Sequence, residues 1–366
     1  HVGYFRINTA HLPNSPDQPA QAFLPWETAI QTGNGFAERT GLRAASRQEL
    51  DFPFQWGHVK LIPFVGGEVA HWQEDRDGVD TTRLFGQAGL RTSLPMWKAN
   101  PTIQHPLFNL QGLIHKVSFD SEFYWADVSE DMSRFPLYDP LDDDANEMFQ
   151  RMFIADNYGG LLPPRFDSRF TALRSGMQRS VTGPTEIADD LVVFQTSVRQ
   201  RWQTRRGFAG KQRIVDWISM DTGLIFFPKP DRDNFGQEIG LANYDFRWHL
   251  GDRTTLLSDG YVDLFGGGLR KFTAGGVISR PGRGNLFLGL RSIDGPFSST
   301  VLVGSTTYRM SKKWILSAGG AVDLGPTGNI GQTIAFTRIG ESFLVKAGFS
   351  ADVSRGNVGA VFSVEP

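Results

Sequence analysis

The sequence predicts an all-β protein: an antiparallel, up-and-down transmembrane β-barrel of about 16 strands, or an incomplete part of a larger barrel. Three observations carry this prediction. Segments of alternating apolar and polar residues recur through the chain, short turn-forming sequences separate them, and no run approaches the roughly 18 apolar residues of a membrane helix. A soluble β-sandwich is the alternative, but strands of about 9 to 12 residues in hairpin succession favour the barrel.

Composition excludes several classes of protein. The 366 residues include 37 Lys plus Arg, 39 Asp plus Glu and no cysteine. A formal net charge of -2 gives no basic excess, so we expect no nucleic-acid partner. Without cysteine there are no disulfides and no thiolate metal sites. The first residues lack the pattern of a secretory signal, so we expect the sequence to start inside a longer protein.

The front half is predicted to contribute four strands. They fall at residues 47–53, 58–72, 84–94 and 113–125, where apolar and polar residues alternate. Pro53 and Pro63 interrupt the first two, which is typical of sheet edges or bulges. Residues 11–40 are rich in Pro and Gly and are not predicted to form a strand.

A long connection follows these strands. Residues 127–186 are predicted to form a loop region on the extracellular side, with one short helix at 145–154. Loops of this length are uncommon in compact soluble domains and ordinary in outer-membrane barrels. We therefore interpret residues 1–366 as one barrel domain.

Residues 190–364 are predicted to form a regular meander of hairpins. In 241–250, for example, Tyr244, Phe246 and Trp248 alternate with Asp245 and Arg247. The same alternation recurs at 191–202, 313–323 and 342–352. Short turns such as 281–284, 325–328 and 355–356 separate the strands, and turns this short join antiparallel neighbours.

The last strand is predicted to close the barrel. Asn357, Gly359, Phe362 and Val364 follow a polar, glycine, aromatic, apolar order that resembles the C-terminal signal read by the barrel-assembly machinery. The chain departs from this signal in having Val rather than an aromatic residue at the last apolar position, with two residues after it.

Basic residues are predicted on the polar, lumen-facing sides of the strands. They are Arg199, Arg201, Arg247, Arg291 and Lys346. Acidic residues such as Asp323 and Asp352 share these faces. Such a mixed lumen suits the passage of a phosphorylated sugar head group, because arginine pairs bidentately with phosphate oxygens. It suits a general porin equally well, and internal ion pairing is the third interpretation.

We predict no catalytic site, no metal site and no cofactor. The seven histidines show no metal-binding spacing, and no nucleophile elbow or phosphate loop is present. His249 is the one candidate for rim catalysis, with a solvated lumen histidine as the simpler interpretation. The acidic stretches 74–80 and 139–147 resemble calcium-binding loops, but solvated surface loops explain them better.

The order of segments resembles the C-terminal barrel of the lipopolysaccharide-assembly outer-membrane protein family, LptD, also called organic solvent tolerance protein. The resemblance is carried by residues 47–54, 59–65, 84–91, 113–117 and 198–207, together with the closing strand, and spans about 47–364. The periplasmic jellyroll of that family is not evident in this sequence. About 16 strands are also fewer than the family's barrel has.

The resemblance implies a function in lipopolysaccharide transport and assembly at the cell outer membrane. The barrel would open laterally at the closing strand and insert lipopolysaccharide into the outer leaflet. The implied partners are lipopolysaccharide, outer-membrane lipids, an LptE-like plug lipoprotein, periplasmic bridge components and the barrel-assembly machinery. A passive porin-like channel is the alternative, followed by an outer-membrane hydrolase.

Overall fold

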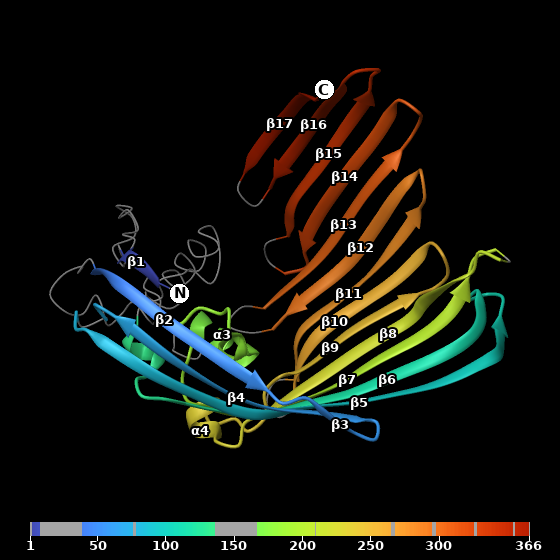
Figure 1. Ribbon diagram of the computed structural model, residues 1–366. Helices are drawn as coiled ribbons and strands as arrows, with labels where there is room; N and C mark the ends of the chain where they lie inside the picture. Colours follow the sequence, from blue (N-terminus) through green and yellow to red (C-terminus); the bar gives the residue numbers. More distant parts are fainter. Residues whose placement is uncertain are drawn as a thin grey trace.

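The computed structural model describes residues 2–7, 39–75, 78–135, 167–208, 210–264, 268–294, 298–325, 328–353 and 356–365. Within these ranges, seventeen strands form a single sheet (Figure 1). They are β1 Val2–Ile7, β2 Arg39–Asp51, β3 Phe54–Trp56, β4 Val59–Trp72, β5 Thr81–His105, β6 Leu110–Val128, β7 Leu191–Arg206, β8 Arg213–Phe226, β9 Ala242–His249, β10 Thr254–Asp263, β11 Gly268–Arg280, β12 Gly284–Ile293, β13 Ser299–Arg309, β14 Trp314–Asp323, β15 Asn329–Ile339, β16 Leu344–Asp352 and β17 Asn357–Glu365.

Strands that follow one another in the chain are antiparallel neighbours in the sheet, as short turns require. β2 and β3 pair with successive stretches of β4, so they act as one strand interrupted at Pro53. The sheet therefore has sixteen strand positions. The predicted all-β, antiparallel, up-and-down fold of about sixteen strands is confirmed.

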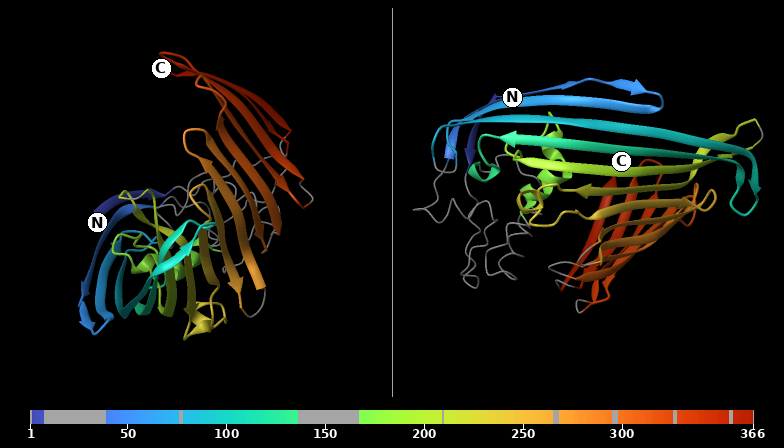
Figure 2. Two further views of the ribbon diagram at one scale, coloured as in Figure 1. Left: turned by 90° about the vertical axis from the view of Figure 1, so that its right-hand side faces the viewer. Right: turned by 90° about the horizontal axis from the view of Figure 1, so that it is seen from below.

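β1 and β17 are the two ends of the sheet. β1 pairs with β2, and β17 pairs with β16. Among the described residues, no ladder joins β1 to β17. Both views in Figure 2 show a strongly curved sheet whose two ends lie apart.

Three of the predicted front strands are longer than the alternation indicated, and the first of them begins at Arg39 rather than at residue 47. β5 has 25 residues and β6 has 19, because their pairing continues past Pro95 as far as Asn100 and resumes at Gln104 after a register shift. The predicted helix at 145–154 lies outside the described residues. Four short helices are described: η1 Met132–Arg134, α3 Ser168–Ser175, η3 Met177–Arg179 and α4 Pro230–Asp233. No helix in the described ranges is long and apolar enough to cross a membrane.

The two faces of the sheet differ in chemistry. One face, here the outer face, presents large apolar side chains to the surroundings, including Leu288 (57% exposed) and Phe362 (72% exposed). The opposite, inner face carries charged and small residues, such as Arg91, which lies opposite Glu122 in the β5–β6 ladder. Strand alternation separates these two sets of side chains.

The apolar core lies on the inner side of β4 to β7. Eight buried residues form the main cluster: Phe64, Phe85, Tyr124, Ala126, Ala188, Leu191, Val193 and Phe227. A second cluster joins Trp72 to Phe135, whose ring centroids are 4.2 Å apart. A sheet that faced only water on this side would leave these aromatic rings exposed, so another part of the chain must cover them.

Candidate functional site

Residues 167–190, here the inner segment, supply part of that cover, with Ala188 in the main cluster; Phe227 and Phe135 supply the rest. The inner segment begins with α3, continues through η3 and ends in extended backbone that leads into β7. Figure 1 shows α3 on the concave side of the curved sheet. The segment therefore occupies the space that the sheet curves around.

Local sequence defines the helical part of the inner segment. The Asp167 carboxylate accepts a hydrogen bond from the Arg169 backbone N–H at 2.9 Å and so caps the N-terminus of α3. Gly176 ends the helix in the left-handed conformation with φ 100°, which favours glycine. η3 follows directly, and its last residue, Arg179, reaches the β6 and β7 side chains.

Arg83 of β5 anchors the end of the inner segment. Its side chain is fully buried and donates to Glu68 Oε1 at 2.8 Å. It also donates to two backbone carbonyls of the inner segment, those of Thr185 and Ala188. Burial lowers the stability of any charge that lacks a partner, so this arginine depends on Glu68.

Two arginines of β2 extend the same network. Arg47 donates through Nε to Glu68 Oε2 at 2.8 Å, so one carboxylate serves both Arg47 and Arg83. Arg47 Nη1 donates to the carbonyls of Gln178 at 2.9 Å and Ser180 at 3.2 Å. Arg43 forms a buried ion pair with Glu186 of the inner segment.

A second charge network lies beside the first. Arg91 pairs with Glu49 and Asp51, each at 3.0 Å, and lies 3.6 Å from Glu122. Glu122 also accepts from Arg179 of the inner segment at 2.9 Å. The two networks tie the inner segment to the inner face through β2, β4, β5 and β6.

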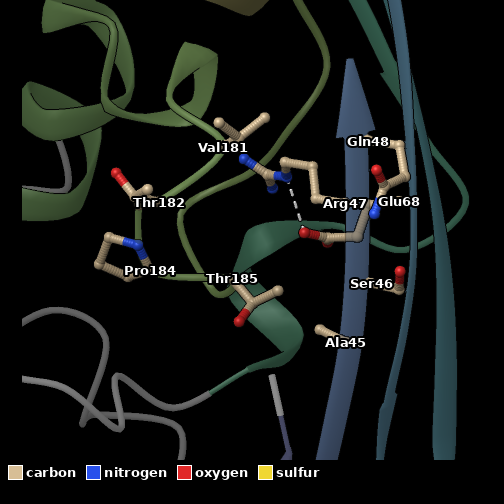
Figure 3. Close-up of a pocket in the computed structure, with 10 residues that line it drawn as sticks. Ala45, Ser46, Arg47, Gln48, Glu68, Val181, Thr182, Pro184 and Thr185 are labelled. Carbon is tan, nitrogen blue, oxygen red and sulfur yellow. Dashed lines mark hydrogen bonds and ion pairs between the residues drawn. The ribbon is translucent and has the colours of Figure 1, made fainter.

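A cavity of about 480 Å³ lies between β2 and the extended part of the inner segment (Figure 3). Its lining is mainly polar: Ala45, Ser46, Arg47, Gln48, Glu68, Val181, Thr182, Gly183, Pro184 and Thr185. Figure 3 shows the Arg47 guanidinium reaching from β2 toward Val181. The cavity is thus bounded by a buried charge on one side and by backbone and hydroxyl groups on the other.

One carboxyl group of the inner segment has a shifted pKa. Burial raises the pKa of Asp189 to about 6, and the nearby charges of Asp131 and Asp190 act in the same direction. The Asp190 backbone N–H donates to Asp189 at 2.9 Å and partly opposes the shift. This side chain therefore changes charge close to neutral pH.

Three of the predicted lumen residues form ion pairs on the inner face. Arg199 lies 2.8 Å from Asp120, and Arg201 donates both Nη atoms to Asp221. Arg247 pairs with Asp245 of its own strand at 3.1 Å. Strand register places these residues on the same face as Arg91. Arg91 is opposite Glu122 on β6, and Asp120 is two residues away from Glu122 and therefore on the same face. Together with the networks around the inner segment, these ion pairs form a strip of charged residues on the inner face that extends across β7 to β9.

Arg291 and Lys346 lie on the same face, farther along the sheet. Arg291 is opposite Thr273 of β11, and Lys346 is opposite Thr337 of β15. Both side chains are exposed, and neither forms an ion pair with another described residue. They are remote in strand order from the inner segment, so the five predicted residues do not make one site.

The four residues predicted for the closing strand divide between the two faces of β17. Phe362 and Val364 are exposed on the outer face. Asn357 and Gly359 are opposite Asp352 and Ser350 of β16, on the inner face. Among the described residues β17 is hydrogen-bonded on one side only, to β16. The predicted part of these residues in a lateral gate stays a prediction.

The structure describes the surroundings of two further candidates from the sequence, His249 and the acidic stretch 74–80. His249 Nδ1 lies 2.9 Å from the Thr255 hydroxyl, with no carboxylate hydrogen-bonded to it in the described part of the chain. Asp75 is buried and accepts from the Val79 N–H, the Thr81 hydroxyl and Arg134. No group of three metal-ligating side chains occurs in the described ranges, and 139–147 lies outside them.

The sequence-based prediction missed the inner segment and its anchors. Arg47 and Glu68 lie in the predicted strands 47–53 and 58–72 with no further role assigned, and Arg43 and Arg83 lie outside the predicted strands. A usable signal was present, because Glu68 is the one acidic residue in 59–72 and alternates onto the same face as Phe64, Ala70 and Trp72. The sequence does not indicate which arginines pair with Glu68, because Arg47 and Arg83 lie on different strands.

Comparison with known proteins leaves the family of this chain open. No protein-family model matches the sequence, and no curated protein matches it.

Solved structures give distant likenesses only. A mutant of the Rh. blastica porin is 10% identical, with a TM-score of 0.32, over all of this chain and 99% of the porin. The FpvAI–pyocin S2 complex gives 9% identity and a TM-score of 0.26, and the match covers 89% of this chain and 47% of that chain. P. aeruginosa FpvA bound to heterologous pyoverdines gives 9% identity and a TM-score of 0.27, and the match covers 52% of that chain. At these scores none of the three carries a functional argument.

Proposed function

We propose that this chain is an outer-membrane channel for small hydrophilic solutes, narrowed by the inner segment. The observation that carries the proposal is the contrast between the two faces of the sheet. The outer face exposes large apolar side chains, whereas the inner face carries a continuous strip of ion pairs and a folded-in segment. An apolar exterior around a polar interior is the arrangement that a water-filled transmembrane barrel requires.

Connection lengths support an orientation in the membrane. At one end of the sheet the turns are short, as at 57–58, 250–253 and 281–283. At the other end lie the longer connections, 73–80, 129–190 and 227–241. In outer-membrane barrels the short turns face the periplasm and the long loops face outward. The inner segment therefore enters the channel from the extracellular side.

Transport through such a channel needs no covalent chemistry. The inner face offers fixed positive and negative charges, which attract and orient charged solutes at close range. The ion pairs of Arg199 and Arg201 leave these charges partly exposed, at 57% and 33% of their side chains. The passage is therefore lined by charges that remain accessible to a solute.

Reconstitution in a planar lipid bilayer tests the proposal. Refolded protein should produce stepwise, ohmic currents in simple salt, and liposomes that carry it should swell in solutions of small sugars. Boiled protein is the control. Absence of both current and swelling in samples with a heat-modifiable, β-rich folded form would contradict the proposal.

Lipopolysaccharide export is the second candidate. It is favoured by one observation: β17 is paired only with β16 in the described residues, as a laterally opening seam would be. It predicts that the protein copurifies with lipopolysaccharide and a lipoprotein that fills the lumen. Purification of the chain without either, together with conductance on its own, would favour the passive channel.

A further inference from the structure

The cavity between β2 and the inner segment has a buried donor, Arg47 Nη2, for which the described residues supply no hydrogen-bond acceptor. The Arg47 side chain is only 5% exposed, and its Cζ lies 4.7 Å from the centroid of the Phe85 ring. Its Nε and Nη1 atoms are hydrogen-bonded. A buried N–H without an acceptor is unfavourable, and the penalty is larger on a charged group.

Two buried arginines share one carboxylate beside this cavity. Glu68 accepts from Arg47, which lines the cavity, and from Arg83, so neither guanidinium has a carboxylate of its own. The next pair, Arg43 with Glu186, is neutral. Among the residues that the structure describes, no other acidic side chain lines the cavity. Its polar lining also includes Thr182 and Thr185, so the cavity offers hydroxyl groups beside the Arg47 guanidinium.

We propose that this cavity is a binding site for a small oxyanion, the carboxylate or phosphate group of a polar solute, with Arg47 Nη2 as its principal donor. An anionic oxygen would accept from this N–H and supply a second negative charge to the two arginines that share Glu68. The volume of about 480 Å³ accommodates a small organic acid or a phosphate monoester. Binding does not depend on whether the chain conducts, so this proposal and the channel proposal fail separately.

Val181 provides a sensitive test. It is 52% exposed, so a polar replacement is tolerated, and Figure 3 shows it beside the Arg47 guanidinium. In Val181→Glu the new carboxylate should occupy the open N–H and exclude an added anion. Val181→Gln has the same shape without the charge and is its matched control. Arg47→Lys keeps the positive charge but removes the forked donor.

The measurement is isothermal titration of the detergent-refolded protein with inorganic phosphate and, separately, with acetate. We expect saturable binding of at least one anion, weakened about tenfold or more by Val181→Glu and by Arg47→Lys. Val181→Gln should bind nearly as the parent does. Arg91→Lys, an inner-face arginine outside this cavity, should also be unaffected. The heat-modifiable band on a gel shows which variants are folded.

The two anions distinguish the source of the oxyanion. Stronger binding of phosphate identifies a phosphorylated solute, and stronger binding of acetate identifies a carboxylic acid. Failure of both anions to bind at millimolar concentration overturns the proposal. Equal binding by Val181→Glu, Val181→Gln and the parent also overturns it, because the anion would then lie elsewhere.

Discussion

At the scale of single residues, the Glu68 carboxylate is the central acceptor of the network that attaches the inner segment to the sheet. Glu68 accepts from Arg47 with one oxygen and from Arg83 with the other, both at 2.8 Å. All three side chains are at least 95% buried. Because both arginines also donate to carbonyls of the inner segment, the charge of Glu68 determines how firmly that segment is attached.

Glu68→Gln should therefore destabilise the protein strongly. It removes the carboxylate that two buried guanidinium groups share, and loss of one partner from a buried pair costs about 3–5 kcal/mol. Urea unfolding of the refolded protein would measure this difference. Asp245→Asn is the control, since its pair with Arg247 is exposed and should contribute less than about 1 kcal/mol. Equal stability of the two variants would contradict the central role of Glu68.

Asp189 predicts a pH dependence of stability. Its pKa in the folded protein, about 6, lies above the ordinary value of 3.8, so the folded state binds the proton more tightly. Its stabilising contribution is thus present below about pH 4 and is lost as the pH rises through about 6.

Asp189→Asn should remove this dependence and stabilise the protein at pH 7 by about 1–3 kcal/mol. Unfolding midpoints at pH 5 and pH 7 for parent and variant provide the measurement. Asp252→Asn, an exposed turn carboxylate, serves as control. An unchanged difference between the two pH values in Asp189→Asn would contradict the assignment.

At the scale of elements, the strands and the inner segment differ in how far the sequence predicts them. Alternation and turn residues predicted the hairpins of 190–364, because strand pairing between chain neighbours is a local property. The inner segment has no such period. Its position depends on pairs such as Arg43 with Glu186, which are 143 residues apart and unreadable from spacing alone. The same reasoning explains why Arg199 and Arg201 could be placed on a polar face while their carboxylate partners could not be named.

Loosening the inner segment should alter conduction. Arg179→Gln breaks the 2.9 Å ion pair to Glu122 of β6 and weakens the contact with Gln195 of β7. These two contacts link η3 to the inner face of the sheet. We expect larger or noisier single-channel currents, because the segment would then fluctuate within the passage. Arg247→Gln, on the same face but away from the segment, is the control. Identical current noise in the two variants would show that the segment does not limit the current.

At the scale of the whole molecule, the notable feature is that β1 and β17 each pair on one side only among the described residues. Sixteen strand positions make these two strands antiparallel if they meet. Unpaired backbone groups in lipid cost several kcal/mol each, so membrane insertion favours their pairing. Tyr4 and Phe362 are both highly exposed outer-face residues, which is the side-chain match that such pairing requires.

Engineered cysteines test this closure without interference, because the chain has no cysteine of its own. Tyr4→Cys, combined in turn with cysteine at Val358, Ala360, Phe362 and Val364, should give one dominant disulfide in the detergent-refolded protein. Cysteine at Ser363, on the inner face, should not cross-link. If no combination cross-links, the two edges do not meet.

The attachment of the inner segment has a consequence for its adaptability. Arg83 and Arg47 grip it largely through main-chain carbonyls, those of Thr185, Ala188, Gln178 and Ser180. A carbonyl is present whatever side chain the residue carries. The exposed side chains of Val181 and Thr182 can therefore be exchanged while these carbonyl contacts stay in place, whereas at Gly183 a Cβ would lie 2.7 Å from the Met177 carbonyl. A library of substitutions at 181 and 182 should change which solutes enter without altering the fold.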